Sequence, residues 1–301
     1  AVAGETALDG AGTSTLRLSY RAPYDWAGML SFLKARALKD VEWVTESFYA
    51  RTVQLGKCKG WIRVTQSEPG DSLLLEFTHS IAPVLPALLN RVRDLFDLSA
   101  RPDLIAEHLS KDKTLRPLVR ANPGLRVPGA FNGFEMGLRA ILGQQITVKA
   151  ATTVACRLVQ AFGKPFATPL PELNRLTPAP EAIAKASVDK LARLGIVSAR
   201  CRTMVCLAAA QVSGKLSLES GTHHDPEETI AQLVELPGIG PWTANYIAMR
   251  ALRWPDAFPK EDIAVRNKLG GVSSRRAEEM SQAWRPWRSY AVLHIWNKPA
   301  R

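Results

Sequence analysis

The stretch Leu236-Pro237-Gly238-Ile239-Gly240-Pro241-Trp242-Thr243-Ala244 decides the fold, because it reverses the chain between two predicted helices. Before it, Asp225 can cap a first helix that begins with Pro226 and ends near Leu236. Pro241 then opens a second helix. Glycines let a phosphate approach the backbone closely, and a helix N-terminus attracts anions. The stretch therefore predicts a helical hairpin with an anion site at its turn, although a plain helical hairpin would carry a similar turn.

A single carboxylate follows this hairpin. Asp262 lies about twenty residues beyond Gly240, at the start of another predicted helix, where the helix dipole favours negative charge. Capping that helix is the ordinary role of an aspartate at such a position. A catalytic role is the alternative, and one carboxylate can serve in both.

The composition favours a polyanionic partner. The chain of 301 residues carries 39 Lys and Arg against 28 Asp and Glu, which gives a net charge of +11. From Arg250 to Arg301 the sequence has eleven basic and five acidic residues, so about half of the excess lies near the C-terminus. A well-solvated helical surface would account for the same charge.

The cysteines predict neither an iron–sulfur cluster nor another metal centre held by side chains, because the four show no paired metal-ligand spacing. They are Cys58, Cys156, Cys201 and Cys206. Their scatter is typical of a reducing cytosol, so a cytoplasmic protein is expected. His223 and His224 are interpreted as a solvated helix leader rather than a metal site. The sequence contains no apolar run of transmembrane length, and no membrane association is expected.

Two patterns follow one another along the chain. Strand-like stretches with β-branched and aromatic residues give way to helical spacing from about Pro102 onward. The expected fold class is therefore α+β, with a small N-terminal antiparallel-sheet domain followed by a mostly α-helical core. We expect a flexible leader over 1–15, the α+β domain over 16–101, a helical subdomain carrying Asp262 over 102–132 and 255–301, and a helical bundle with the hairpin over 133–254.

The expected elements are placed by periodicity and by Gly, Pro and Asp signals. Strands are expected at 16–20, 42–53, 60–65 and 72–78. Helices are expected at 24–37, 83–96, 134–142, 147–162, 180–194, 198–212, 263–269, 274–284 and 289–296, with a Pro-rich connector at 164–180.

The hairpin and the aspartate that follows it resemble the helix-hairpin-helix element of DNA-repair glycosylases. Three further segments narrow the match to the AlkA-type 3-methyladenine DNA glycosylase II family, over roughly residues 16–298. These segments are Pro23-Tyr24-Asp25-Trp26, Arg139-Ala140-Ile141-Leu142-Gly143-Gln144-Gln145 and Trp284-Arg285-Pro286-Trp287-Arg288-Ser289-Tyr290-Ala291-Val292-Leu293-His294-Ile295-Trp296. The resemblance implies excision of cationic alkylated purines, such as 3-methyladenine, from duplex DNA in base excision repair. It also implies a monomer associated with the bacterial nucleoid.

The chemistry implied by the resemblance depends on Asp262. As the base leaves, the sugar develops positive charge, which a carboxylate stabilises while it orients the attacking water. In relatives that also nick DNA, a lysine two residues beyond the second glycine forms a Schiff base. Trp242 occupies that position here, so a monofunctional enzyme without AP-lyase activity is expected. Lys260 is assigned to phosphate or solvent contact. The alternative is a non-catalytic helix-hairpin-helix module, which would need neither this aspartate nor an aromatic cluster.

The resemblance also assigns a substrate pocket. Trp296 would line it together with Trp242 and Tyr246, and Phe32 from the first domain would close it. Electron-rich ring faces attract a cationic base by about 0.5–2 kcal/mol. Gln144 is assigned to the same pocket.

DNA contacts are assigned to the hairpin and to one loop. Gln145 stands at the tip of the expected wedge, where the best-known family member has leucine, and an ordinary interhelical loop is the alternative. The hairpin residues assigned to DNA are Pro237, Gly238, Ile239, Gly240 and Thr243. Backbone carbonyls of Val234, Leu236 and Ile239 could hold a structural monovalent cation, and no other cofactor is expected.

Overall fold

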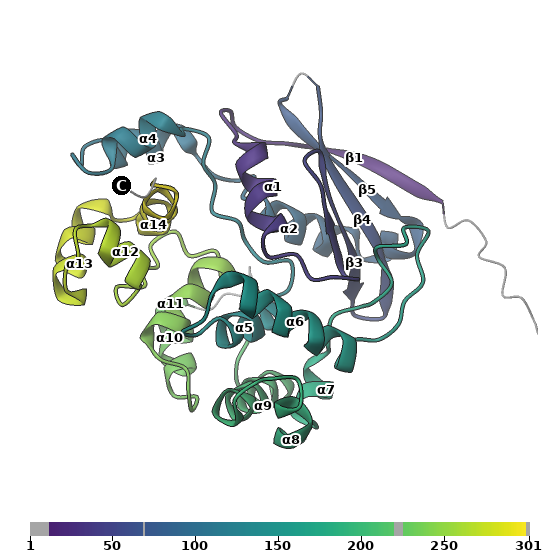
Figure 1. Ribbon diagram of the computed structural model, residues 1–301. Coiled ribbons are helices and arrows are strands. Elements are labelled where there is room, and N and C mark those ends of the chain that lie inside the picture. The colour runs from purple at the N-terminus through teal and green to yellow at the C-terminus, as the bar shows by residue number, and fades with distance from the viewer. Residues whose placement is uncertain (1–11, 69, 220–224, 299–301) are drawn as a thin grey trace, which may run out of the picture.

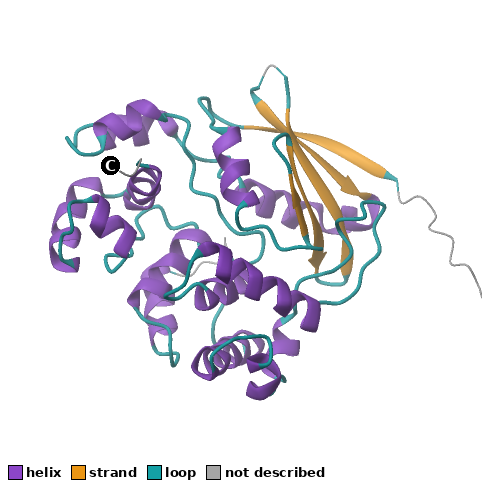
Figure 2. Cartoon of the chain, in the orientation of Figure 1, coloured by secondary structure: helices purple, strands orange, loops and turns teal. Residues whose placement is uncertain are grey.

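The computed structural model describes residues 12–68, 70–219 and 225–298, and its N-terminal part is an antiparallel sheet (Figures 1 and 2). Five strands are ordered β1-β5-β4-β3-β2. They are β1 (Thr13–Ser19), β2 (Glu42–Val44), β3 (Phe48–Leu55), β4 (Cys58–Gln66) and β5 (Ser72–Thr78). The predicted α+β fold is confirmed. The first strand starts at Thr13, before the expected boundary at residue 16, because Thr13–Ser19 pairs with β5 along its whole length.

Two helices cover one face of the sheet, α1 (Trp26–Lys34) and α2 (Leu85–Leu95) (Figure 1). The side chain of Asp25 caps α1 by accepting the Gly28 N–H at 2.8 Å. In α2 the buried residues repeat at helical spacing, so one stripe of the helix packs on the sheet. A 3-10 turn, η1 (His79–Val84), precedes α2 and accounts for the early part of the helix expected at 83–96.

The single strand expected over 42–53 is wrong, because a tight turn divides it. The Thr45 hydroxyl accepts the N–H groups of Ser47 and Phe48 at 3.2 and 3.1 Å, and the Thr45 N–H donates to the Phe48 carbonyl at 3.0 Å. The chain therefore reverses between β2 and β3, and Val44 pairs with Tyr49.

The Pro-rich connector returns to the second face of the sheet, where Leu173 is buried against Ala50 and Trp61. The Asp40 carbonyl accepts the N–H groups of Asn174 and Arg175, each at 2.9 Å. The loop that follows α6 can be followed toward the strands in Figure 1. The sheet is thus covered on both sides, although the connector lies far from it in sequence.

The remaining described chain is helical, as predicted, and α5 is its central helix. All residues of α5 except Arg139 are buried. The helix expected over 180–194 is wrong, because Ser187 starts a second short helix by accepting the Lys190 N–H at 3.3 Å. The helices are α3 (Pro102–Leu109), α4 (Arg116–Ala121), α5 (Gly133–Leu142), α6 (Val148–Phe162), α7 (Pro180–Ala184), α8 (Val188–Ala192), α9 (Ser198–Val212), α10 (Pro226–Val234), α11 (Pro241–Arg250), α12 (Ile263–Lys268), α13 (Ser274–Ser281), η2 (Gln282–Trp284) and α14 (Arg288–Asn297).

A buried network of charges joins the sheet to α5. Arg51 of β3 contacts Glu135 at 2.8 Å, and Arg139 contacts the same carboxylate at 2.6 Å. Arg139 also pairs with Glu42 of β2, which accepts the Tyr49 hydroxyl at 2.6 Å. Two carboxylates therefore compensate two guanidiniums where the domains meet.

Burial alone would raise the pKa of Glu42, but Arg139 and Arg51 outweigh burial and lower it from 4.5 to about 2. A carboxylate with a depressed pKa in the folded state contributes stability at every pH above its ordinary pKa. The contribution is lost as the pH falls from about 4.5 through about 2.

Glu42→Gln should lower the free energy of unfolding by about 3–5 kcal/mol at pH 7, because it leaves two buried guanidiniums, Arg51 and Arg139, with Glu135 as their one remaining carboxylate in the network. The difference from wild type should shrink as the pH falls from 4.5 toward 2, where wild type loses the same charge. Urea unfolding at several pH values measures it. Glu46→Gln is the control, because Glu46 is 87% exposed. An equal loss in both variants would contradict a special role for the network.

Candidate active site

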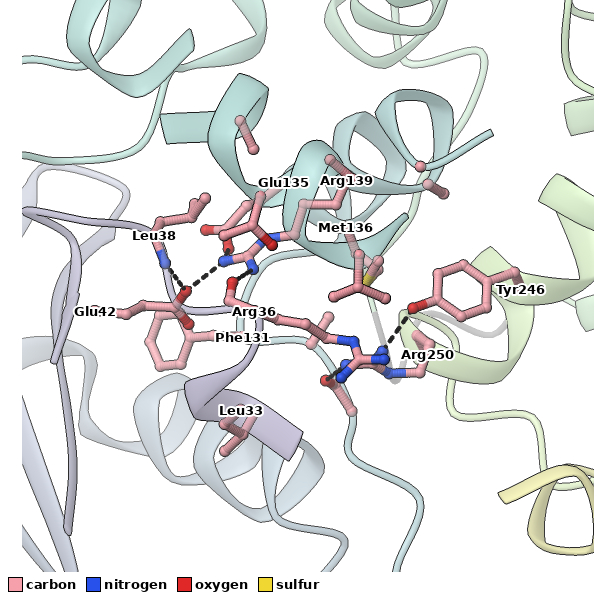
Figure 3. Close-up of a pocket in the computed structure, with 18 of the residues that line it drawn as sticks. Leu33, Arg36, Leu38, Glu42, Phe131, Glu135, Met136, Arg139, Tyr246 and Arg250 are labelled. Carbon is pink, nitrogen blue, oxygen red and sulfur yellow. Dashed lines mark hydrogen bonds and ion pairs between the residues drawn. The ribbon is translucent and has the colours of Figure 1, made fainter. Parts of the chain in front are cut away.

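A cavity of about 500 Å³ lies between the sheet domain and the helical part. Its walls combine residues of α1, α5, α6 and α11 with Asp262 and Trp296. Figure 3 shows Glu42, Glu135 and Arg139 at one end and Tyr246 with Arg250 at the other. Pockets of this size bind small organic groups, and a few polar groups on mostly apolar walls orient the ligand.

Asp262 is 8% exposed and is held by three N–H donors. The Trp242 indole donates to Oδ2 at 2.9 Å, and the Trp296 indole donates to Oδ1 at 3.2 Å. The backbone N–H of Val265 donates to Oδ1 at 2.8 Å, so Asp262 is also the N-cap of α12. Both carboxylate oxygens are therefore fixed at the edge of the cavity, and the predicted cap is confirmed.

The three predicted aromatic residues meet in this cavity. Trp242 and Tyr246 stack with ring centroids 5.4 Å apart and an interplanar angle of 4°. Tyr246 and Trp296 are tilted by 53° at 6.2 Å. One face of Trp242 is occupied by Tyr246, so the aromatic surface left for a ligand belongs to the other face of Trp242 and to Trp296.

Two arginines beside the aromatic residues were not anticipated. Arg250 donates to the Tyr246 hydroxyl at 2.9 Å and to the Gly129 carbonyl at 3.2 Å. Burial alone would raise the pKa of Tyr246, but Arg250 and Arg36 outweigh burial and lower it. The positions of Arg36 and Arg250 depend on contacts between the end of α1, α11 and the 128–129 segment. No local sequence pattern predicts these contacts.

Phe32 does not line this cavity; it lines a second cavity behind it. Its ring is covered by two guanidiniums, with Arg36 3.7 Å and Arg250 4.8 Å from the ring centroid. From this part of the chain, Leu33 of α1 and Arg36 just after it line the first cavity in place of Phe32.

In the loop between α5 and α6, Gln145 is exposed at the tip, whereas Gln144 contacts the hairpin. Gln145 is exposed and has a φ of 57°, a left-handed conformation that is uncommon for a residue with a side chain. Gln144 does not line the cavity. Its amide donates to the Gly238 carbonyl at 2.9 Å and to the Thr243 hydroxyl at 3.0 Å, so it ties this loop to the hairpin.

The two hairpin glycines differ in whether the fold would accept a side chain at their positions. Gly238 has a φ of 84°, and a Cβ there would lie 2.1 Å from the Thr203 hydroxyl. Gly240 has an ordinary φ of −91°, and a Cβ there would meet no atom within 4 Å. The fold itself therefore requires only Gly238. Gly240 leaves the N-terminus of α11 open, as an anion site needs. Of the other assigned hairpin residues, Pro237 is exposed, whereas Ile239 and Thr243 are buried.

Exposed apolar side chains line the cavity or are next in sequence to residues that line it. Ile263, directly after Asp262, is 69% exposed, and Ile146 beside Gln145 is 38% exposed. Ile146 and Val148 also line the cavity. The sequence did not single out these residues, because an isoleucine in a helix or loop carries no local sign of its exposure.

The site is built without clustered metal ligands. In the described part of the chain, no group of three or more His, Cys, Asp or Glu side chains could hold a metal ion. His223 and His224 lie outside the described residues. The carbonyl of Leu236, one of the three assigned to a cation, accepts the Ile239 N–H at 3.1 Å. Lys260 lies 3.8 Å from Glu278.

No helix among the described residues is long and apolar enough to cross a membrane.

Two family models cover most of the chain. The AlkA N-terminal domain matches residues 15–132, and the HhH-GPD superfamily base excision DNA repair protein matches residues 138–289. Among solved structures, the 3-methyladenine DNA-glycosylase from Archaeoglobus fulgidus superposes with a TM-score of 0.80 at 20% identity, covering 93% of this chain and 97% of that one. The two proteins share a fold.

Two curated relatives agree with these matches. DNA-3-methyladenine glycosylase 2 of Escherichia coli (strain K12) is 35% identical over 93% of this chain and 95% of its own length. The probable bifunctional transcriptional activator/DNA repair enzyme AlkA of Mycobacterium tuberculosis (strain ATCC 25618 / H37Rv) is 39% identical over 97% of this chain, which spans 58% of that longer protein. The chain belongs to the HhH-GPD superfamily of base excision DNA repair proteins.

Proposed function

We propose that the chain is a monofunctional DNA glycosylase that excises alkylated, chiefly cationic purines such as 3-methyladenine from duplex DNA. The observation that carries this proposal is the carboxylate of Asp262, held by two indole N–H groups and one backbone N–H beside an aromatic cavity. The named activity of the 35% identical Escherichia coli relative supports it.

The reaction separates charge along the bond between the sugar and the base. The electron pair of that bond leaves with the base, and the sugar becomes an oxocarbenium ion. A fixed carboxylate stabilises the developing charge without reorganising during the reaction, and it can accept a proton from the attacking water. Asp262 is proposed for both tasks, while Trp242 and Trp296 hold its two oxygens in place.

The residue two positions beyond Gly240 is not a lysine, which argues for hydrolysis of the glycosidic bond without cleavage of the DNA strand. An imine with the sugar needs an amine at the reacting carbon. Trp242 stands at the position of that lysine and donates to Asp262 instead. Lys260 is directed to Glu278 at 3.8 Å. We therefore expect the abasic site to be left intact.

DNA would be bound on both sides of the cavity mouth. The open turn at Gly240 and the N-terminus of α11 suit a phosphate, with Pro237 exposed beside them. On the other side, Gln145 would enter the gap left by the flipped base, with Ile146 and Ile263 adding apolar surface. Gln144 and Thr243 would act indirectly, because their hydrogen bonds connect the Gln145 loop to the hairpin.

Several further assignments belong to the same proposal. The chain would act as a monomer on nucleoid DNA in the bacterial cytoplasm, with the domain boundaries given above except for the earlier first strand. A monovalent cation on the carbonyls of Val234, Leu236 and Ile239 would stabilise the hairpin turn, and oxygen ligands suit such an ion. No step of the reaction passes through this ion. A non-catalytic binding module is not favoured, because phosphate binding alone makes no use of a triply held carboxylate.

Asp262→Asn should reduce release of free base from methylated duplex DNA by at least about a hundredfold, because it removes the charge that stabilises the oxocarbenium ion. Affinity for a duplex with an abasic-site analogue should persist. Glu261→Gln is the matched control, because Glu261 is the neighbouring carboxylate and does not line the cavity. Near wild-type excision by Asp262→Asn would refute the catalytic assignment.

Gly240→Asp should weaken binding to all duplexes alike, because the new carboxylate repels a phosphate that carries no sequence information. Its melting temperature should stay close to wild type, since a Cβ at this position meets no atom within 4 Å. Gly238→Ala should instead lower the melting temperature, through its clash with Thr203 and its φ of 84°. Unchanged DNA affinity in folded Gly240→Asp would mean that the hairpin does not face DNA.

Trp296→Phe should slow excision of every substrate while Trp296→Ala should also lose the preference for cationic bases. The first variant removes the indole N–H that orients Asp262 and keeps a smaller aromatic face, whereas the second removes the aromatic face entirely. Excision rates on a cationic and a neutral lesion, measured beside melting temperatures, separate the two roles. Parallel loss of stability and of both activities would place Trp296 in the core instead.

A further inference from the structure

A second cavity of about 610 Å³ lies behind the first, between α1, α4 and α14. Arg36 and Trp296 line both cavities, so these two side chains form the wall between them. Figure 1 shows the three helices arranged around this region, on the side of α14 away from the hairpin. Nothing in the proposed excision step uses this space.

His294 is the most unusual residue of the second cavity. It is only 5% exposed, it lines the cavity, and its ring forms no hydrogen bond with another residue of the described ranges 12–68, 70–219 and 225–298. Burial lowers its pKa from 6.5 to about 4, so the imidazole is neutral at pH 7. A neutral imidazole offers one donor and one acceptor, and buried polar groups normally have a partner. The ring therefore has hydrogen-bonding capacity that a ligand in the cavity could use.

The rest of the lining suits a flat, uncharged ligand. Trp296 supplies aromatic surface, the Phe32 ring lies in the wall against the Arg36 and Arg250 guanidiniums, and Met29, Leu118 and Leu293 supply aliphatic surface. Polar groups face the same space from several sides: Asp25 and Ser31 next to and on α1, Asn122 after α4, and Asn297 on α14. The lining also carries charges of both signs: Asp25, which accepts from Asn122 at 2.6 Å, and the guanidiniums of Arg36 and Arg126. Such walls fit a planar heterocycle with both donors and acceptors.

Excision itself produces a molecule of this kind. When the bond between the sugar and a cationic alkylpurine breaks, its electron pair moves onto the base and cancels the positive charge. The product, for example free 3-methyladenine, is therefore neutral. It no longer gains from the cation–π and carboxylate contacts of the first cavity. A neighbouring site that offers an imidazole and side-chain amides would bind it without those contacts.

We infer that the second cavity is a binding site for the released neutral purine, which hydrogen-bonds to His294 and packs against the rear of the Trp296 wall. The inference rests on the proposed function and extends it to the fate of the product. The abasic DNA can then stay in the first cavity while the base occupies the second. Arg36 and Trp296 separate the two sites.

Free 3-methyladenine should bind to the full chain while an abasic-site duplex is bound. NMR of the histidine rings follows the titration, and His294→Phe identifies the His294 signal among the five histidines. The His294 signal should shift in a saturable manner. Ser31→Trp, at the exposed rim of the cavity, should weaken binding at least tenfold. Ala27→Trp, exposed on the same helix but outside the cavity, should stay within twofold of wild type.

Two outcomes would overturn the inference. In the first, the base shifts the Trp242 indole signal and leaves His294 unchanged, which would place the ligand in the first cavity. In the second, Ser31→Trp binds the base as tightly as wild type. These readouts need no catalysis, so they are informative even if His294→Phe does not fold. Failure of the proposed function is seen separately, as absence of excision from methylated DNA by wild type.

Discussion

The orientation of the Asp262 carboxylate depends on three N–H donors that come from separate segments of the chain. Trp242 lies in the first turn of α11, Val265 in α12 and Trp296 near the end of α14. The donors can converge only if the hairpin, the loop to Asp262 and the C-terminal helix pack correctly. Each hydrogen bond to a charged group contributes about 1.5–3 kcal/mol. The geometry of the site therefore depends on the packing of the C-terminal subdomain. Substitution of either tryptophan should affect both the orientation of Asp262 and this packing.

The charges around the cavity constrain where a cationic base can sit. Cation–π contact contributes about 0.5–2 kcal/mol, whereas two unit charges 4 Å apart interact by about 4 kcal/mol near a protein surface. An arginine close to a cationic base would thus outweigh the aromatic attraction. Arg51 and Arg139 are compensated by Glu42 and Glu135. Arg36 lies over the Phe32 ring, and Arg250 donates to the Tyr246 hydroxyl, so neither guanidinium is hydrogen-bonded to Asp262. Selectivity for cations should therefore reside on the Asp262, Trp242 and Trp296 side.

Local sequence predicted the features that depend on neighbours in the chain. The cap at Asp225, the turn at Gly238, the start of α6 at Thr147 and the cap at Asp262 all follow from residues a few positions apart. The antiparallel sheet followed from alternation and turn signals. The turn at Thr45 was missed although its hydrogen bonds are local, because β-branched and aromatic residues stand on both sides of it. Features that depend on tertiary contacts were missed as well: the connector on the sheet and the two arginines beside Tyr246. The position of Phe32 was mistaken for the same reason, because a residue on α1 can face either cavity until the domain packing is known.

The proposed wedge residue Gln145 shows how neighbouring residues affect what one side chain can contribute. Gln145 adopts a left-handed φ of 57° at an exposed tip, a conformation that costs about 1–2 kcal/mol for a residue with a Cβ. Gln144 holds the same loop through two hydrogen bonds to the hairpin, which fixes the tip despite that cost. A glutamine at the tip offers hydrogen bonds to an orphaned base, but it replaces little of the stacking surface that the flipped base removes. Ile146 and Ile263 are both exposed and could replace that surface. In the proposed function, the apolar part of the wedge would thus be distributed over two segments, and Gln145 would supply the polar contact.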